Sequence, residues 1–275
     1  MASSVVITGA STGIGAACAA HLAGRGFNVF AGVRKAADAE RLAAQIPGVH
    51  PLFIDVTQPE VIAQAVQEVA QVAGSLHGLV NNAGVAYPGP LEFAPLEDVR
   101  RHMEINVIGQ VAVTQAFLPL LRPARGRVVH MSSMGGVNSI PYFGAYCASK
   151  FALEGLNDAL RLELRPFGMH VSIIEPGAVR TPIWAKAEGD ADAMFADYPP
   201  EAWAYYGRTL RWLQKTIPQM GGMPPERVAR AVEHALTARR PRARYVIDWP
   251  SRLRAWLEIL PVPLRDWAIA RAMQR

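Results

Sequence analysis

A tyrosine and a lysine four residues apart are the side chains of this sequence best suited to chemistry. Tyr146 and Lys150 lie in Tyr146-Cys147-Ala148-Ser149-Lys150, and on a helix this spacing places both on one face. A free tyrosine has a pKa of about 10 and is a poor base at neutral pH. A neighbouring ammonium stabilises the phenolate, so we expect Lys150 to lower the pKa of Tyr146. The pair is a candidate proton-transfer site, and the lysine has donors left to bind a ribose.

A serine at the end of a predicted strand could complete this site. Ser133 follows the run Val128-Val129-His130-Met131-Ser132 and precedes Tyr146 by thirteen residues. Its hydroxyl can hydrogen-bond a substrate oxygen and orient that oxygen toward Tyr146. Tyr-x-x-x-Lys by itself is common on helix surfaces, so the serine strengthens the catalytic interpretation. For His130 we favour a buried, hydrogen-bonded histidine over an added acid or base.

A glycine-rich turn near the N-terminus predicts a phosphate-binding site. Thr8-Gly9-Ala10-Ser11-Thr12-Gly13-Ile14-Gly15 joins a predicted strand to a predicted helix. The spacing is G-x-x-x-G-x-G and differs from the G-x-G-x-x-G dinucleotide fingerprint. Glycine lets the backbone approach a ligand, and the helix N-terminus offers free N–H groups to a pyrophosphate. An ordinary strand–helix connection is the alternative.

The end of the second predicted strand bears on the choice between NAD and NADP. An acidic residue there would bind the ribose 2′-hydroxyl of NAD, whereas an arginine accommodates the 2′-phosphate of NADP. The sequence reads Gly32-Val33-Arg34-Lys35, and Arg34 offers a permanently charged fork suited to phosphate. The alternative is a solvated loop arginine. We therefore expect NADP(H), with modest discrimination because position 12 of the glycine turn is Thr12 and not a second basic residue.

Strands and helices alternate through most of the chain. The predicted strands are short and apolar: Val5–Thr8, Phe27–Val33, Val49–Ile54, one beginning at Leu79–Val80, Arg127–Met131, His170–Ile174 and Arg244–Ile247. The predicted helices carry apolar residues at helical spacing: Gly13 to about Arg25, Ala36–Gln45, Glu60–Val72, Leu96–Leu121, Ala145–Arg165 and Val228–Thr237. Such a chain requires a parallel sheet buried on both faces, with its ligand at the carboxyl ends of the strands. We predict a doubly wound α/β fold and one domain over residues 1–275.

These motifs, together with three others, resemble the short-chain dehydrogenase/reductase family in its shorter, single-domain branch. They occur in the family's order: Thr8–Gly15, Asn81-Asn82-Ala83-Gly84, Asn106, Ser133, Tyr146–Lys150 and Pro176-Gly177-Ala178-Val179-Arg180-Thr181. The resemblance extends over residues 4–182. It implies a Rossmann-type sheet of seven parallel strands and a nicotinamide cofactor, which supplies the hydride while the protein moves the proton.

The resemblance also implies the roles of individual residues. Asn106 would be the fourth catalytic residue and would hold a water that connects Lys150 to solvent. Ser133 and Tyr146 would contact the substrate. The cofactor-binding residues would be Gly9, Ser11, Thr12, Gly13, Ile14, Gly15, Arg34, Asp55, Val56, Asn82, Ala83, Gly84, Tyr146, Lys150, Pro176, Gly177, Val179 and Thr181.

Three groups within that set would contact different parts of the cofactor. Asp55 and Val56 would contact the adenine, although a strand-end aspartate that caps the next helix is the alternative. Asn82-Ala83-Gly84 would run past the adenosine ribose. The backbone of Val179 and the hydroxyl of Thr181 would hold the nicotinamide carboxamide.

Two segments outside the strand–helix pattern bear on the substrate. Residues 183–225 are rich in aromatic side chains and methionine and correspond to the family's substrate lid; the alternative is ordinary packing of two short helices. Residues 249–275 read as two amphipathic helices around Pro261 and Pro263. For these we favour packing on the pocket or on a partner over contact with an anionic membrane. The arrangement most resembles hydroxysteroid and retinol dehydrogenases, which implies a lipophilic alcohol or carbonyl substrate.

Composition narrows the class of protein further. Two cysteines and no export signal indicate a reducing compartment, and no apolar run reaches the length of a transmembrane helix, so we expect a cytoplasmic protein. Nine arginines lie in residues 239–275, but no nucleic-acid motif accompanies them, and we expect no nucleic-acid partner. The histidines and cysteines lack metal-ligand spacing, so we expect no metal.

The leading hypothesis is therefore an NADP(H)-dependent oxidoreductase. A catalytically silent NADP(H)-binding sensor or scaffold is the alternative, although such proteins usually lack the tyrosine or the lysine that this chain carries. Members of the family commonly pair through the helices that hold Asn106 and Tyr146, so we expect a homodimer or homotetramer.

Overall fold

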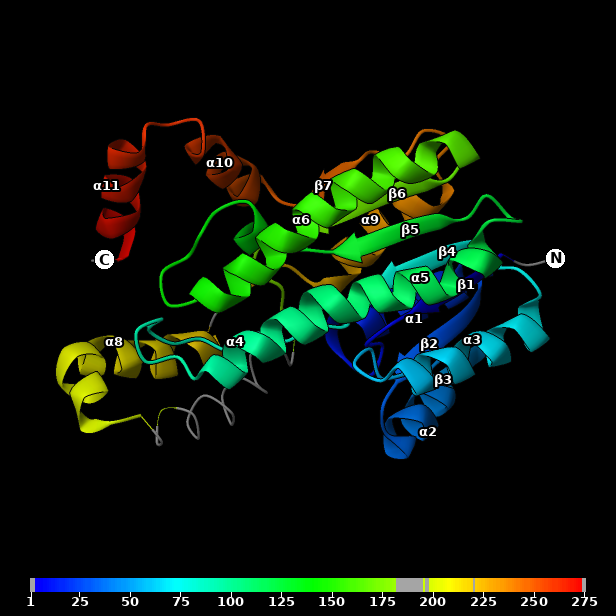
Figure 1. Ribbon diagram of the computed structural model, residues 1–275, viewed down its shortest axis with the longest axis horizontal. Coiled ribbons are helices and arrows are strands. Elements are labelled where there is room, and N and C mark those ends of the chain that lie inside the picture. The colour runs from blue at the N-terminus through cyan, green and yellow to red at the C-terminus, as the bar shows by residue number, and fades with distance from the viewer. Residues whose placement is uncertain (1–2, 182–194, 196–197, 220, 274–275) are drawn as a thin grey trace.

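Seven short strands form one parallel sheet in the computed structural model, which describes residues 3–181, 195, 198–219 and 221–273. The strands are β1 (Ser4–Ile7), β2 (Asn28–Val33), β3 (Val49–Phe53), β4 (Gly78–Asn81), β5 (Arg127–Met131), β6 (His170–Glu175) and β7 (Arg244–Val246). Their order is β3-β2-β1-β4-β5-β6-β7 (Figure 1). This confirms the predicted doubly wound sheet. The order reverses between β1 and β4, which is where such sheets bind ligands.

Burial explains why most strands are apolar throughout. All four residues of β1 are buried, as are all four of β4. The edge strand β3 differs, because it mixes buried Val49 and Leu52 with exposed His50 and Phe53. It also contains Pro51, whose missing N–H is tolerated at an edge. Central strands covered on both faces need apolar side chains on both faces.

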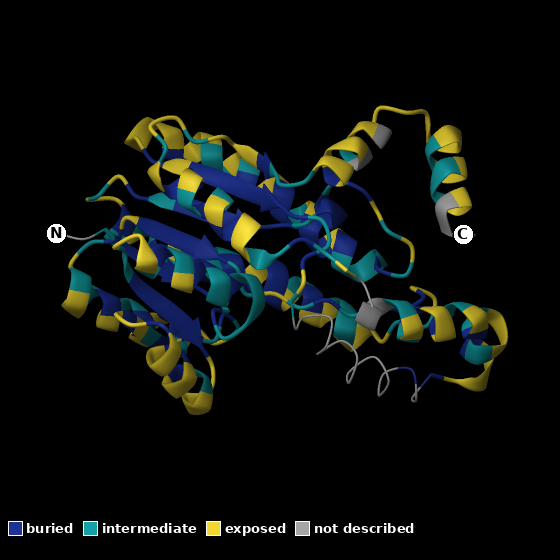
Figure 2. Cartoon of the chain, turned by 180° about the vertical axis from the view of Figure 1, so that it is seen from behind, coloured by how far each residue is buried: buried dark blue, intermediate teal, exposed yellow. Residues whose placement is uncertain are grey.

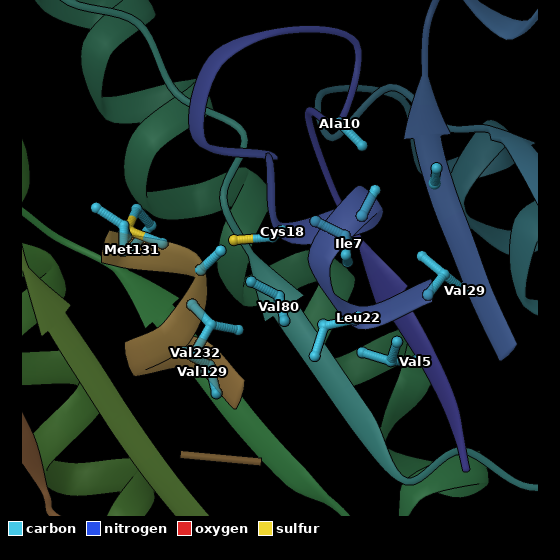
Figure 3. Packing of buried hydrophobic residues seen from close by; sticks show 14 of the residues in the cluster. Val5, Ile7, Ala10, Cys18, Leu22, Val29, Val80, Val129, Met131 and Val232 are labelled. Carbon is cyan, nitrogen blue, oxygen red and sulfur yellow. The ribbon is translucent and has the colours of Figure 1, made fainter. Parts of the chain in front are cut away.

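One face of the sheet is covered by α1 (Gly13–Gly24), α2 (Ala36–Gln45) and α9 (Pro225–Thr237). Figure 3 shows Cys18 and Leu22 of α1 packed against Val5, Ile7 and Val80 of the central strands, with Val232 of α9 beside Val129. This cluster fixes α1, and with it the glycine turn that precedes the helix.

The other face is covered by α3 (Pro59–Ala73), α5 (Gly109–Leu121) and α6 (Gly144–Leu164). The helix α4 (Leu96–Met103) continues through a π-helical segment, Glu104–Ile108, into α5, as the predicted helix Leu96–Leu121 requires. Among the described residues this one helix is long and apolar enough to cross a membrane. Half of its most apolar stretch is buried, and the core helix of a soluble protein meets the same criteria.

The two variable segments differ from the expected pattern. Within residues 183–225 the described part forms one 20-residue helix, α8 (Pro200–Gln219), where two short helices were the alternative to a lid. The C-terminal helices α10 (Trp249–Leu257) and α11 (Val262–Met273) form as predicted. Both project from the body of the protein (Figures 1 and 2), and their large apolar side chains, such as Trp249, Trp256 and Trp267, are exposed within the single chain. The structure therefore does not show these side chains packed on the chain's own pocket, which was one of the two expected arrangements.

Candidate active site

The glycine turn lies at the carboxyl end of β1 and needs glycine for two reasons. Gly9 and Gly13 have φ values of +63° and +59°, in the left-handed region that side chains disfavour. A Cβ on Gly9 would lie 2.8 Å from Cα of Ala83, and one on Gly15 would lie 2.3 Å from the carbonyl oxygen of Gly9. The turn is therefore a close-packed cradle with no room for a side chain at Gly9 or Gly15.

Asn82 and Ala83 hold this cradle in place. The backbone N–H groups of both residues donate to the Thr8 hydroxyl at 3.0 Å. The Asn82 side-chain amide donates to the carbonyl oxygens of Thr8 and Gly9, again at 3.0 Å. These contacts give the side chain of Asn82 a structural role within the chain. Gly84, next along, is exposed at the rim of the site.

The N-terminus of α1 offers a place for a phosphate group. Thr12 is its N-cap and makes no side-chain capping hydrogen bond, and the first turn holds no acidic residue. The N–H groups of Gly13, Ile14 and Gly15 point out of the helix start, where a pyrophosphate would complement both the free donors and the helix dipole. The residues present therefore fit a dinucleotide.

Arg34 follows β2 directly and is exposed, at the strand end next to the glycine turn. The N–H of Ala10 donates to the carbonyl oxygen of Gly32 at 2.8 Å, which ties the two segments together. Sequence reasoning missed a second basic residue here. Arg41 on α2 donates to the carbonyl oxygen of Ser11 at 2.7 Å and pairs with Asp38 at 2.7 Å. The only sequence signal for Arg41 was its place in the helix that directly follows Arg34.

Asp55 does not cap the next helix, because the N-cap of α3 is Gln58 and makes no side-chain capping hydrogen bond. One of its carboxylate oxygens accepts from the N–H of Thr57 at 3.0 Å and from the Thr57 hydroxyl at 2.7 Å. These bonds shape the turn before α3. Val56, beside it, is buried and packs with Ile105 in the cluster on that face. Adenine binding by this pair stays a prediction.

The proton-transfer pair lies on the first turns of α6. Lys150 is buried, and its Nζ donates to the carbonyl oxygen of Met131 at 2.9 Å and lies 5.8 Å from the centre of the Tyr146 ring. Ser133 follows β5, and its Oγ accepts from the N–H of Gly135 at 3.0 Å. Burial lowers the pKa of Lys150 to about 8, and Glu154 acts in the opposite direction. The three residues meet at the carboxyl end of β5.

The pKa of Tyr146 differs from the prediction. Burial raises the pKa of its hydroxyl to about 12, and the nearby Ser133 acts in the opposite direction. We expected Lys150 to lower this pKa, but in the chain alone the cost of burying a phenolate is larger than what the neighbouring groups supply. Tyr146 is therefore a proton donor at neutral pH.

Asn106 is buried in the π-helical segment and bonds two other parts of the chain. Its side-chain amide accepts from the N–H of Val85 at 2.8 Å and donates to the carbonyl oxygen of Val85 and to the Ser149 hydroxyl, both at 3.0 Å. It thus joins the end of β4 to α6 beside Lys150. π-Helical turns are frequent at functional sites. The water-holding role implied by family resemblance is a prediction that these contacts do not address.

Two buried histidines flank the site. His102 lies one helical turn before Asn106; one ring nitrogen bonds the carbonyl oxygen of Asp98 at 2.8 Å and the other accepts from the N–H of Tyr87 at 3.1 Å. Its ring is 6.3 Å from that of Tyr146, edge to face. His130 bonds Asn157 at 3.1 Å, and burial lowers its pKa to about 4, so it is a neutral core residue as we favoured. His102 was not singled out from the sequence, although its four-residue spacing from Asn106 placed it on the same face.

An aromatic cluster lies beside Tyr146 on the substrate side. Phe195 and Tyr198, from the segment before α8, are buried with Phe143 and Leu210, and the ring of Tyr146 packs against the cluster. A shallow pocket adjoins it, lined by residues that include Tyr87, Leu91, His102, Tyr142 and Tyr198. Tyr205 and Trp212 on α8 point to solvent instead. Part of the segment 183–225 thus packs beside Tyr146, and its role as a lid stays a prediction. Trp184, Met194 and Met220 lie outside the described residues.

The loop after β6 borders the site on the remaining side. The N–H of Met134 donates to the carbonyl oxygen of Pro176 at 3.0 Å, which places the loop next to Ser133. A Cβ on Gly177 would lie 2.5 Å from the Ser251 hydroxyl at the start of α10. Val179 is buried and forms a β-bridge with Met223, and Thr181 is the last residue described before a gap. Among the described residues no group of His, Cys, Asp and Glu could hold a metal ion.

Comparison with known proteins identifies relatives over nearly the full chain. The family described as short chain dehydrogenase matches residues 3–192. Retinol dehydrogenase 5 of Mus musculus is 38% identical and aligns with 98% of this chain and 90% of its own length. An NADPH-dependent 3-dehydrocapnine reductase of Ornithobacterium rhinotracheale is 37% identical, with 95% and 94% covered. A short chain dehydrogenase of Burkholderia cenocepacia, solved in complex with NADP, superimposes with a TM-score of 0.75 at 26% identity, over 98% of this chain and 97% of that one.

Proposed function

The chain belongs to the short-chain dehydrogenase/reductase family and is an oxidoreductase that acts on CH–OH groups, and from this premise we propose that it interconverts a lipophilic alcohol and its carbonyl compound with NADP(H). The observation that carries the proposal is the meeting of Ser133, Tyr146 and Lys150 at the carboxyl end of β5. Geometry, and not the motif alone, brings a proton donor, an orienting hydroxyl and an ammonium to one place.

The residues divide the work as follows. The nicotinamide, when bound, supplies or accepts the hydride. Ser133 orients the substrate oxygen, and Tyr146 gives that oxygen its proton in the reductive direction. Lys150 binds the ribose and stabilises the phenolate that remains.

NADP(H) is favoured over NAD(H) on the charge around the adenosine end of the site. Arg34 is exposed at the end of β2, and Lys35 follows it, so a 2′-phosphate there would meet two cations and no carboxylate at the strand end. The NADPH-dependent reductase and the NADP complex among the relatives are in keeping with this preference.

A lipophilic substrate is favoured by the surroundings of Tyr146. Phe143, Phe195 and Tyr198 belong to the apolar cluster against which the tyrosine ring packs, and Leu91 lines the adjoining pocket. We also propose that two copies pair through α5 and α6, since large apolar side chains are exposed there: Ile108 directly before α5, and Phe151, Leu156 and Leu162 on α6. Light scattering of the purified chain tests the pairing.

The experiment that tests the activity is turnover of NADPH absorbance against a panel of lipophilic ketones and aldehydes. Tyr146→Phe should reduce kcat by about 10²- to 10⁴-fold, the usual contribution of general acid catalysis. NADPH binding should survive, because the hydroxyl and not the ring is lost. Tyr205→Phe, on the exposed side of α8, is the matched control and should leave kcat unchanged. Activity of Tyr146→Phe within a factor of about three of wild type contradicts the assignment and favours a sensor or scaffold.

A further inference from the structure

A row of ionisable side chains continues along α6 beyond the proton-transfer pair. Tyr146, Lys150, Glu154 and Asp158 follow at four-residue intervals, which places them along one ridge of the helix. The last two have no part in the site described above. Glu154 is only 7% exposed, and a buried carboxylate is stable only when charged or hydrogen-bonding partners compensate for lost water.

Arg244 on β7 is the partner of Glu154. Its Nη1 donates to the carboxylate of Glu154 and, at 2.8 Å, to that of Glu175 at the end of β6. Its Nη2 donates to Asp158 at 2.6 Å. Arg161 also pairs with Asp158, at 3.4 Å, so two guanidiniums face three carboxylates and negative charge is in excess. Burial raises the pKa of Glu154 to about 7, and the negative charge of Glu175 acts in the same direction. Burial also raises the pKa of Glu175, and there the negative charge of Asp158 adds to the rise.

Glu154 packs directly against the backbone that carries Lys150. A Cβ added to Gly136 would lie 3.0 Å from the carbonyl oxygen of Lys150, 3.1 Å from Cγ of Glu154 and 2.7 Å from the Ser132 hydroxyl. These three groups therefore converge on the turn that follows Ser133. Glu154 thus lies next to the turn that follows Ser133, beside the candidate site.

Charge from this cluster reaches Lys150. Burial lowers the pKa of Lys150, and the carboxylate of Glu154 raises it. The other ionisable groups around the lysine do not compete, since burial lowers the pKa of both His102 and His130, and the lysine's charge lowers it further. The neutral imidazoles leave Glu154 as the group that favours the ammonium form.

We propose that Glu154 is a positioning residue of the proton-transfer site: its carboxylate, held by Arg244 one helical turn beyond Lys150, keeps the lysine in its ammonium form. The site then retains its positive charge, and with it the means to stabilise a phenolate at Tyr146, to a higher pH than the buried lysine would allow alone. The consequence for catalysis rests on the proposed function, but the effect on Lys150 is measurable without turnover.

The lysine can be titrated directly because the chain has only four: Lys35, Lys150, Lys186 and Lys215. Protein labelled with ¹³C at the lysine ε-carbon should give four signals, and Lys150→Met identifies the one of interest. In wild type this signal should titrate with a midpoint near 8. In Glu154→Gln the midpoint should fall by about one pH unit, the lower end of what a close opposite charge produces.

Asp158→Asn is the matched control, because it also removes a carboxylate from Arg244 but one turn farther from Lys150, where the side chain is 41% exposed. Its midpoint should equal that of wild type. An unchanged midpoint in Glu154→Gln, or an equal shift in Asp158→Asn, overturns the proposal. Near-ultraviolet circular dichroism checks that the variants fold. If Glu154→Gln does not fold, Glu154→Asp is the substitute, because its shorter side chain keeps the charge but moves it away from Lys150. The Lys150 midpoint in Glu154→Asp should then lie below that of wild type, and an unchanged midpoint also overturns the proposal.

The pH profile of NADPH-dependent carbonyl reduction gives the functional readout. Loss of the ammonium reduces kcat/KM at high pH, and neutralising Glu154 lowers the pKa of Lys150, so the basic limb should move to lower pH. A purely structural role would lower activity equally at every pH. If the wild-type protein turns nothing over, the proposed function fails while the lysine titration still decides the role of Glu154.

Discussion

Replacing Arg34 by alanine should remove most of the preference for NADPH over NADH. The guanidinium is exposed just past β2, two residues after Gly32, whose carbonyl oxygen accepts from the glycine turn. A charge-assisted hydrogen bond to phosphate contributes about 1.5–3 kcal/mol. Because Arg34 is exposed and Lys35 lies next to it, the free energy lost should be near the lower end of this range. The kcat/KM for NADPH should therefore fall about 10- to 30-fold. Arg41 compensates little, because Asp38 and Ser11 already engage it.

Steady-state kinetics with each cofactor at saturating carbonyl substrate measure this change. The loss should appear as a higher KM for NADPH with kcat nearly unchanged, because the 2′-phosphate lies far from the reacting carbon and binds ground and transition states alike. NADH should be almost unaffected. Arg100→Ala, an exposed arginine on α4, is the control for loss of a surface charge. Equal losses with both cofactors, or a wild-type preference for NADH, would refute the assignment of Arg34 and leave the oxidoreductase assignment intact.

Three more perturbations test other parts of the site. Lys150→Ala should weaken NADPH binding in fluorescence titrations as well as lower kcat; a change in kcat alone would contradict the ribose contact. Gly9→Ala forces a Cβ to within 2.8 Å of backbone at positive φ, so it should cost about 1–3 kcal/mol of stability and raise the Kd for NADPH, whereas Gly24→Ala, with open space around it, should do neither. Deleting residues 250–275 removes Ser251, which lies against Gly177, and Glu258, which bonds Asn138. This deletion should change substrate KM or assembly more than it changes turnover of a small carbonyl. Deleting residues 260–275 spares both contacts and should have the smaller effect on KM. Insoluble protein from the shorter deletion would show that the last helix completes the fold.

The sequence was sufficient for whatever depends on local spacing. Apolar strand runs joined by helices leave a parallel sheet as the only way to bury both faces, so the fold class followed from pattern alone. Tyr146 and Lys150 share a face because a helical turn is a property of neighbouring residues. The positive φ values at Gly9 and Gly13 are likewise a local property, because glycine adopts this conformation more easily than other residues.

Tertiary structure decided whatever depends on residues far apart in the chain or on the amount of water left around them. Arg244 meets Glu154 across ninety positions because β7 joins the sheet edge beside β6, and no spacing rule relates the two. The pKa of Tyr146 rises although a lysine is near, because burial depends on what the rest of the chain covers. The sequences of α10 and α11 carry the amphipathic pattern of a helix packed on a core, yet their tryptophans are exposed. A pattern says which face is apolar, and only the folded chain shows whether anything covers it.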